Sequence, residues 1–271
     1  MQSKIAGESV TERNKFLLIG ALVVILGAAA WYVFGGNLPA ELPRASAHVY
    51  ARPEINLKDI QLDIFYTVPK NREAFDYDTL KSKLEIMMPK IASFHKSQFG
   101  DKSLLHYRIF SNIVTLQEEG IFYDTNDTRY GNPQALKNIT LELEARVYDK
   151  EGDLYEEDFA TPQNYNSESF RVIGIIYEGL GAAGTEGVVL LSRDWVTNKE
   201  KERGSEQPED EYKTINASLF YHEFGHAMGI PEGYDIYTNR PFTNDIMGSG
   251  RRAPIEGNYI DQATLKEMGV F

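Results

Sequence analysis

The pattern of hydrophobic and polar positions begins with an uncharged apolar run from Phe16 to Phe34. At about 1.5 Å per residue, this run would form a helix of roughly 28 Å, close to the ~30 Å hydrocarbon core of a bilayer. Arg13 and Lys15 precede the run, and no Lys or Arg follows it until Arg44. The positive-inside rule therefore places the N-terminus in the cytoplasm. We favour a single-pass anchor over a cleaved signal peptide, whose apolar core is shorter, about 7–15 residues.

This anchor divides the chain into four predicted segments. Residues 1–15 form a cytoplasmic N-terminus, 16–34 the transmembrane helix, 35–54 a linker and 55–271 one large domain. The linker is punctuated by glycine and proline and has no apolar period. We expect a protein of the cell membrane whose large domain lies outside the cytoplasm.

Patterns typical of strands and helices alternate through the large domain. Apolar positions at every second residue predict half-buried strands, and apolar positions three and four apart predict helices with one buried face. The order of these patterns indicates an α+β, α/β-layered domain in which a late helix follows the last strand. The expected strands are about 57–68, 104–116, 170–177 and 187–191, with a glycine-rich turn between the last two, and the expected helices are about 76–98, 133–148, 214–228 and 261–268.

Composition narrows the kinds of chemistry that are available. The hydrophobic share of 42% is sufficient for a core, and the net charge is −12. An acidic chain with no basic stripe argues against nucleic acid as a partner, because phosphate binding needs clustered Lys and Arg. The chain has no cysteine, so a metal site would have to use His, Asp or Glu.

The predicted helix at 214–228 contains an HExxH pattern formed by His222, Glu223 and His226. Residues four apart lie on one face of a helix, one turn apart. Two imidazoles in that arrangement can bind one zinc ion at about 2.0–2.1 Å each. The carboxylate of Glu223, one step round the helix, can reach a water on the metal and accept its proton.

The residues around the motif predict that this helix is buried. Apolar residues lie on the same stripe as the two histidines and on the adjacent stripe. Polar side chains on a buried helix need partners, because an unpaired buried polar group costs several kcal/mol. A metal ion and its water would satisfy all three side chains of the motif. The apolar residues are Ile215, Leu219, Phe220, Phe224 and Ala227.

The segment after the helix turns the chain back toward the motif. Gly229 can adopt the left-handed conformation that ends a helix, and Pro231 prevents its continuation. Glu232 then arrives where a third ligand could bind, and three protein ligands plus water form the catalytic arrangement of zinc. Further on, residues 244–250 predict a tight turn that carries Met247.

The segments HEFGHAMGIPEGYD and DIMGSG together resemble the metzincin metallopeptidases, and within them the immune inhibitor A-like peptidases. The resemblance covers about Leu219 to Gly250. It implies a zinc cofactor, a metzincin-like catalytic domain with a mixed sheet, and a buried active-site helix. By the same resemblance, the metal ligands are His222 and His226, the general base is Glu223, and Met247 forms the hydrophobic floor of the site.

The resemblance leaves two assignments open. Glu232 stands at the metzincin spacing after the Gly229 turn and is the favoured third ligand. Asp235 is the alternative, because acidic third ligands in the immune inhibitor group need not fall at one position. Ser249 replaces the tyrosine that some metzincins use to stabilise the oxyanion. Tyrosines that could substitute are Tyr234, Tyr237 and Tyr259.

A gluzincin would take its third ligand from a separate helix, where Glu256 or Glu267 would be possible by distance. That interpretation would leave the signals at Gly229 and Met247 unexplained. The remaining histidines are scattered along the chain, and a solvated or hydrogen-bonded structural role is expected for each. They are His48, His95 and His106.

The expected function is that of a membrane-anchored zinc endopeptidase that cleaves protein or peptide substrates outside the cytoplasm. The predicted strand from Gly187 to Leu191 precedes the motif helix and could be the edge strand that pairs with an extended substrate. The alternative is a non-catalytic, membrane-anchored module that binds metal or protein on the same scaffold. The intact set of His222, Glu223, His226 and Glu232 favours the enzyme.

Overall fold

A computed structural model describes residues 46–125, 131–148, 169–197, 209–233 and 243–271. The predicted anchor and most of the predicted linker lie outside these residues. None of the helices in the described ranges combines the length and apolar character that a membrane crossing requires. Residues Ser46–Phe271 form one compact unit, so the domain begins before the predicted boundary at residue 55.

The centre of the domain is a mixed five-stranded sheet with the order β4-β3-β5-β7-β6. Parallel pairing joins β3 to β4, β3 to β5, and β5 to β7, whereas β6 runs antiparallel to β7 at one edge. The sheet confirms the α+β class with a mixed sheet. The strands are β3 (Asp59–Val68), β4 (Leu104–Thr115), β5 (Phe170–Tyr177), β6 (Ala182–Thr185) and β7 (Val188–Ser192).

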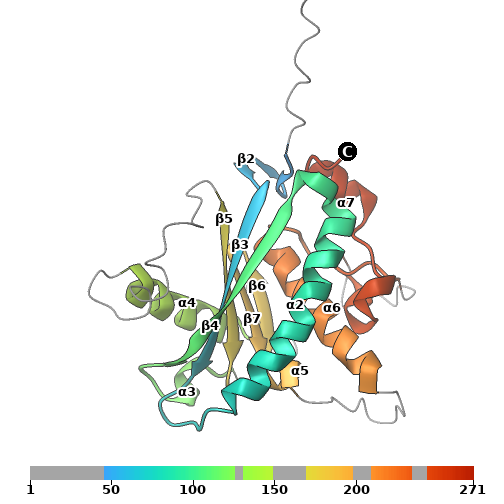
Figure 1. Cartoon of the computed structure of the whole chain (residues 1–271). Helices are drawn as coiled ribbons and strands as arrows, with labels where there is room; N and C mark the ends of the chain where they lie inside the picture. Colours follow the sequence, from blue (N-terminus) through green and yellow to red (C-terminus); the bar gives the residue numbers. More distant parts are fainter. Residues whose placement is uncertain (1–45, 126–130, 149–168, 198–208, 234–242) are drawn as a thin grey trace, which may run out of the picture. The chain divides into compact units, whose positions relative to one another are not determined.

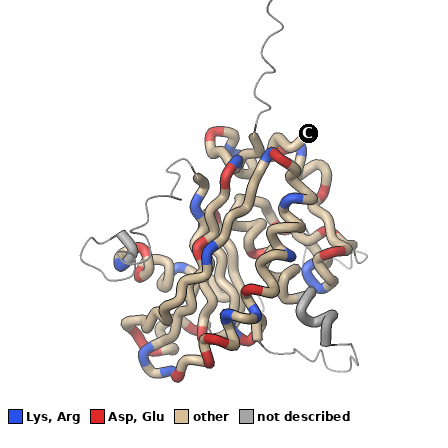
Figure 2. Tube along the Cα trace, viewed as in Figure 1, with Lys and Arg blue, Asp and Glu red and all other residues tan. Residues whose placement is uncertain are grey.

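Helices cover both faces of this sheet (Figure 1). On one face, α2 (Tyr77–Phe99) and α6 (Glu209–Ala227) pack on the sheet and on each other. On the other face, α4 (Pro133–Tyr148) covers a second, smaller hydrophobic cluster. Shorter helices are α3 (Gly120–Tyr123), α5 (Arg193–Thr197) and α7 (Gln262–Glu267). Figure 2 shows basic and acidic residues interspersed along the trace, in line with the lack of a basic stripe in the sequence.

The predicted strands and helices of the domain are present, and their ends differ by a few residues. Asp76 caps α2 by accepting a hydrogen bond from the backbone N–H of Thr79 at 3.0 Å, and Asp261 caps α7. Helix α6 begins earlier than expected, at Glu209. Residues 46–54 were predicted to be linker, yet they contribute β1 (His48–Val49) and the start of β2 (Arg52–Asn56), and bury Val49.

The prediction that residues 187–191 form the edge strand was wrong. The segment predicted at 187–191 is β7, which lies inside the sheet between β5 and β6. The edge is β6, inside the stretch that was predicted to be only a glycine-rich turn. Its sequence, Ala-Ala-Gly-Thr, has little strand propensity. Its small side chains are explained by α6, which packs closely against this strand.

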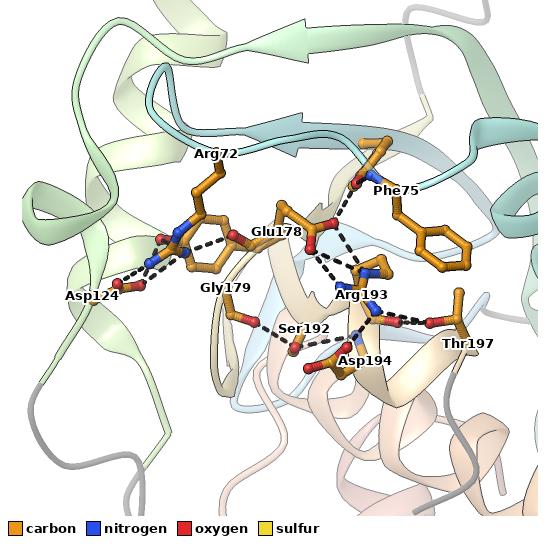
Figure 3. A network of polar contacts seen from close by, with 11 residues as sticks. Arg72, Phe75, Asp124, Glu178, Gly179, Ser192, Arg193, Asp194 and Thr197 are labelled. Carbon is orange, nitrogen blue, oxygen red and sulfur yellow. Dashed lines mark hydrogen bonds and ion pairs between the residues drawn. The ribbon is translucent and has the colours of Figure 1, made fainter.

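A polar network ties together the loops at the carboxyl ends of the parallel strands (Figure 3). After β5, Glu178 forms an ion pair with Arg193 at 2.5 Å and accepts a hydrogen bond from Tyr66. Beside it, Arg72 pairs with Asp124 and donates to the backbone carbonyl of Glu178 at 2.6 Å. These contacts join the loop after β3, the end of β5 and the start of α5, which indicates a structural role.

Buried His95 has the hydrogen-bonded structural role expected for it. Its Nδ1 lies 3.0 Å from the hydroxyl of Tyr221, and its Nε2 lies 2.9 Å from the hydroxyl of Ser103. Ser103 donates its own hydrogen to the carbonyl of Leu57 at 2.6 Å, so it accepts from His95. Burial lowers the pKa of His95 to about 3, so this histidine stays neutral and joins α2 to α6.

Candidate metal centre

The HExxH motif occupies the last two turns of α6, as predicted. His222 is 1% exposed and Glu223 is 9% exposed, while the side chain of His226 is 15% exposed. The apolar neighbours Phe220, Phe224 and Ala227 are fully buried, which confirms that this part of the helix lies in the core. The motif therefore holds three polar side chains inside the domain.

Backbone carbonyls orient both histidine rings. The Nδ1 atom of His222 lies 2.8 Å from the carbonyl oxygen of Ile246, and the Nδ1 atom of His226 lies 2.7 Å from that of Ile230. A carbonyl oxygen can only accept, so each Nδ1 must carry the hydrogen. In the neutral rings, each Nε2 then keeps a lone pair, which is the form that binds a metal.

The turn after α6 brings Glu232 to these Nε2 atoms. Gly229 has a φ of +81°, and the backbone N–H of Ile230 donates to the carbonyl of Gly225 at 3.0 Å, so the helix ends in the left-handed turn that was predicted. The Oε1 atom of Glu232 lies 3.6 Å from Nε2 of His222 and 3.5 Å from Nε2 of His226. Potential ligand atoms of the three residues all lie within 4.8 Å of one another.

The methionine turn lies beneath this cluster. Met247 is buried, and its sulfur would be 2.3 Å from a Cβ placed on Gly225, so glycine inside the motif allows this close approach. The backbone N–H of Gly233 donates to the carbonyl of Met247 at 2.8 Å. The segment that carries Glu232 is therefore hydrogen-bonded to the turn below the histidines.

The local environment shifts the pKa values of Glu223 and Glu232 in opposite directions. Burial raises the pKa of Glu223, although the nearby His222 and His226 oppose the change. Burial also disfavours the charge of Glu232, but the two histidines beside it outweigh that effect and lower its pKa to about 2. One carboxylate is thus suited to accepting a proton, and the other to remaining a charged ligand.

This donor set fits zinc. Two imidazole nitrogens and one carboxylate oxygen form a three-ligand set that leaves a position for water, as in catalytic zinc sites. Both rings present the nitrogen that a ligand needs, and Glu232 is held in its charged form. Bound here, zinc would be held by His222, His226 and Glu232.

Arg251 also reaches the cluster, although no sequence pattern pointed to it. Its Nη1 atom lies 3.2 Å from Nε2 of His222 and 4.0 Å from Oε1 of Glu232. It belongs to a 3₁₀ turn, Ser249–Arg252, that begins two residues after Met247. No motif marked this position, because its proximity to the histidines depends on how the chain folds back after Met247.

The other candidates have different positions. Asp235, Tyr234 and Tyr237 lie outside the described residues. Glu256 forms an ion pair with Lys90 at 3.0 Å. Among the described residues, neither Glu256 nor Glu267 belongs to the group of side chains that could bind a metal ion. The side chain of Ser249 hydrogen-bonds the backbone of Thr243. The Nδ1 atom of His48 lies 3.0 Å from the carbonyl oxygen of Val49. The Nε2 atom of His106 lies 3.8 Å from Oδ1 of Asp59.

Strand β6 lies directly against the motif helix. A Cβ built on Gly184 would be 2.1 Å from the carbonyl oxygen of Glu223 and 2.9 Å from Cβ of His226. The first of these contacts is with backbone, which cannot move aside as a flexible side chain can. The edge strand of the sheet therefore runs beside the candidate metal centre at this glycine.

Replacing Gly184 with Ala should destabilise the fold by about 1–3 kcal/mol, because β6 and α6 would have to separate to accommodate the methyl group. Urea unfolding followed by circular dichroism measures the change. Thr185→Ala, at the exposed next position of β6, is the matched control and should shift stability by less than about 0.5 kcal/mol. Equal stability of Gly184→Ala and the unmodified protein would contradict the close packing.

Comparison of the sequence with models of protein families and with curated proteins found no match. The metzincin resemblance therefore stays a prediction that depends on the motif residues themselves.

Proposed function

We propose that this protein is a zinc-dependent endopeptidase. The observation that carries the proposal is the convergence of Nε2 of His222, Nε2 of His226 and Oε1 of Glu232 next to buried Glu223. Both rings are held by backbone carbonyls in the form that leaves Nε2 available as a ligand. The order of these residues, followed by Met247, supports a metzincin-like catalytic domain.

The proposed reaction is hydrolysis of a peptide bond. When bound, zinc lowers the pKa of its water and polarises the scissile carbonyl. Glu223 accepts a proton from the attacking water as the water oxygen bonds to the carbonyl carbon. Glu223 then gives that proton to the leaving nitrogen as the carbon–nitrogen bond breaks, and ends the cycle ionised again. Burial raises its pKa, which suits a group that accepts and then donates a proton.

An extended substrate would pair with β6. Edge strands carry backbone groups that can bind a peptide as an added strand. Gly184 packs against the backbone of Glu223 and near His226, so a peptide paired along this edge would pass the candidate centre. At the other end of the strand, the carbonyl of Ala182 accepts from the backbone N–H of Asn132 at 3.0 Å, which limits how far pairing could extend.

We also propose that the enzyme is held at the cell membrane with its catalytic domain outside the cytoplasm. The apolar run at 16–34 and the basic residues before it support this placement. Its substrates would then be proteins or peptides on the outer side of the membrane.

The decisive experiment is hydrolysis of an unstructured, fluorescently labelled protein by the full chain in detergent. A chelator should abolish cleavage, and added zinc should restore it, because the proposed chemistry needs the metal. The cleavage products and the bound zinc are measured in the same sample. Tight zinc binding without cleavage of any member of a broad peptide library would instead support a non-catalytic, metal-binding module.

A further inference from the structure

We propose that Arg251 is a catalytic residue that donates a hydrogen bond to the oxyanion formed on the scissile carbonyl. This inference rests on the proposed peptidase function. Its starting point is position: Nη1 of Arg251 lies 3.2 Å from Nε2 of His222 and 4.0 Å from Oε1 of Glu232. A donor therefore faces the point on which the three candidate ligands converge.

The chemistry of the side chain suits this role. A guanidinium keeps its positive charge in proteins and presents several N–H donors in a fixed plane. Attack by water turns the carbonyl oxygen of the substrate into an oxyanion, and donors aimed at that atom lower the barrier. Arg251 gives up no proton in this step. The side chain is 22% exposed, so part of it remains accessible to an incoming peptide.

The turn that carries Arg251 is held in place by the helix that carries the histidines. Ser218, one helical turn before His222, donates to the carbonyl of Ala253 at 2.5 Å. Buried Asn258 donates to the carbonyl of Gly250 at 2.8 Å. Arg251 thus lies between two residues whose carbonyls are fixed, and its backbone is positioned before any substrate arrives. Such preorganisation is what makes an oxyanion donor effective.

Ser249, another polar residue of the same turn, forms its hydrogen bonds elsewhere. The hydroxyl of Ser249 donates to the carbonyl of Thr243 at 3.0 Å and accepts from the N–H of that residue at 2.8 Å. Those contacts tie Ser249 to Thr243, just before the turn that carries Met247. The guanidinium of Arg251, two residues later, instead reaches Nε2 of His222 in the candidate ligand cluster.

The test compares Arg251→Met with Arg252→Met in the full chain. Arg252 is the exposed neighbour in the same turn and serves as the matched control. For Arg251→Met, kcat/KM should fall about 10²- to 10³-fold, mainly through kcat, as for loss of one oxyanion donor. The control should stay within about 3-fold of the unmodified protein.

Two binding measurements separate this role from a structural one. A phosphinic peptide, which carries a tetrahedral anion, should bind Arg251→Met about 10²-fold or more weakly. An ordinary peptide of the same sequence, measured in the inert Glu223→Gln background, should bind with nearly unchanged affinity. Zinc affinity, measured by chelator competition, should be equal or higher in Arg251→Met, because a positive charge next to His222 is removed.

The outcomes distinguish the possible failures. A fall of tenfold or more in zinc affinity would show that Arg251 only supports the ligands, and would overturn the inference. Full activity of Arg251→Met in an unmodified protein that cleaves peptides would overturn it while leaving the proposed function intact. An unmodified protein that binds zinc and cleaves nothing would overturn both.

Discussion

Replacing Glu223 with Gln should lower kcat by about 10²- to 10⁴-fold and leave zinc binding unchanged. The amide has nearly the same shape as the carboxylate but cannot accept the proton of the attacking water. Glu223 is not part of the candidate ligand cluster, so the metal should still bind. Initial rates of peptide cleavage and the zinc content of the same purified protein measure both parts of the expectation.

Glu256→Gln is the matched control for this substitution. Glu256 is exposed and forms an ion pair with Lys90 of α2. It does not belong to the candidate ligand cluster. Removing its charge should leave cleavage within about twofold of the unmodified rate, since an exposed ion pair contributes little. Undiminished cleavage by Glu223→Gln would contradict the proposed mechanism, and loss of zinc from that variant would mean that Glu223 acts on the metal rather than on the proton.

Replacing Glu232 with Gln should lower zinc affinity by more than about 100-fold, beyond what loss of a residue that merely supports a ligand usually costs. The physical reason is the loss of a charged oxygen that lies 3.6 Å and 3.5 Å from the two histidine nitrogens. Chelator competition with a zinc-sensitive dye measures the affinity without any need for activity.

Asp235→Asn provides the comparison for Glu232→Gln, because both substitutions remove one carboxylate from the segment after the helix. If Asp235 only supports the site, its loss should reduce zinc affinity by about 100-fold or less. The reverse ranking, with the larger loss in Asp235→Asn, would make Asp235 the third ligand and refute the assignment of Glu232.

Local patterns predicted most of the fold. The alternation from Leu57 to Val68 became β3, and the stripe from Leu80 to Ile91 became the buried face of α2. The prediction for α2 succeeded because burial imposes a period close to four on a helix. Strand β3 lies where it was predicted, but the expected half-buried pattern was wrong: every residue from Leu62 to Val68 is buried, because helices cover both faces of the sheet. Strand β6 was not predictable in this way, because its short Ala-Ala-Gly-Thr sequence is determined by contact with α6, which is remote in sequence.

The candidate site was predicted as far as local geometry determines it. The spacing of His222 and His226 places both on one helical face, and Gly229 starts a turn that brings Glu232 back to them. Arg251 could not be identified in the same way. Its position depends on hydrogen bonds between separate segments, such as the one from Ser218 to Ala253, and such contacts leave no periodic trace in the sequence.

Backbone carbonyls orient both imidazoles, and this affects how the sequence around the site can change in evolution. They belong to Ile230 and Ile246, and a peptide carbonyl is present whichever amino acid occupies a position. Many zinc sites orient their histidines with carboxylate side chains, which must be kept for the site to survive. Here the orienting groups are independent of residue type. A lineage could therefore change nearly every residue around the ligands, and lose recognisable similarity to its relatives, while the imidazoles keep the same orientation.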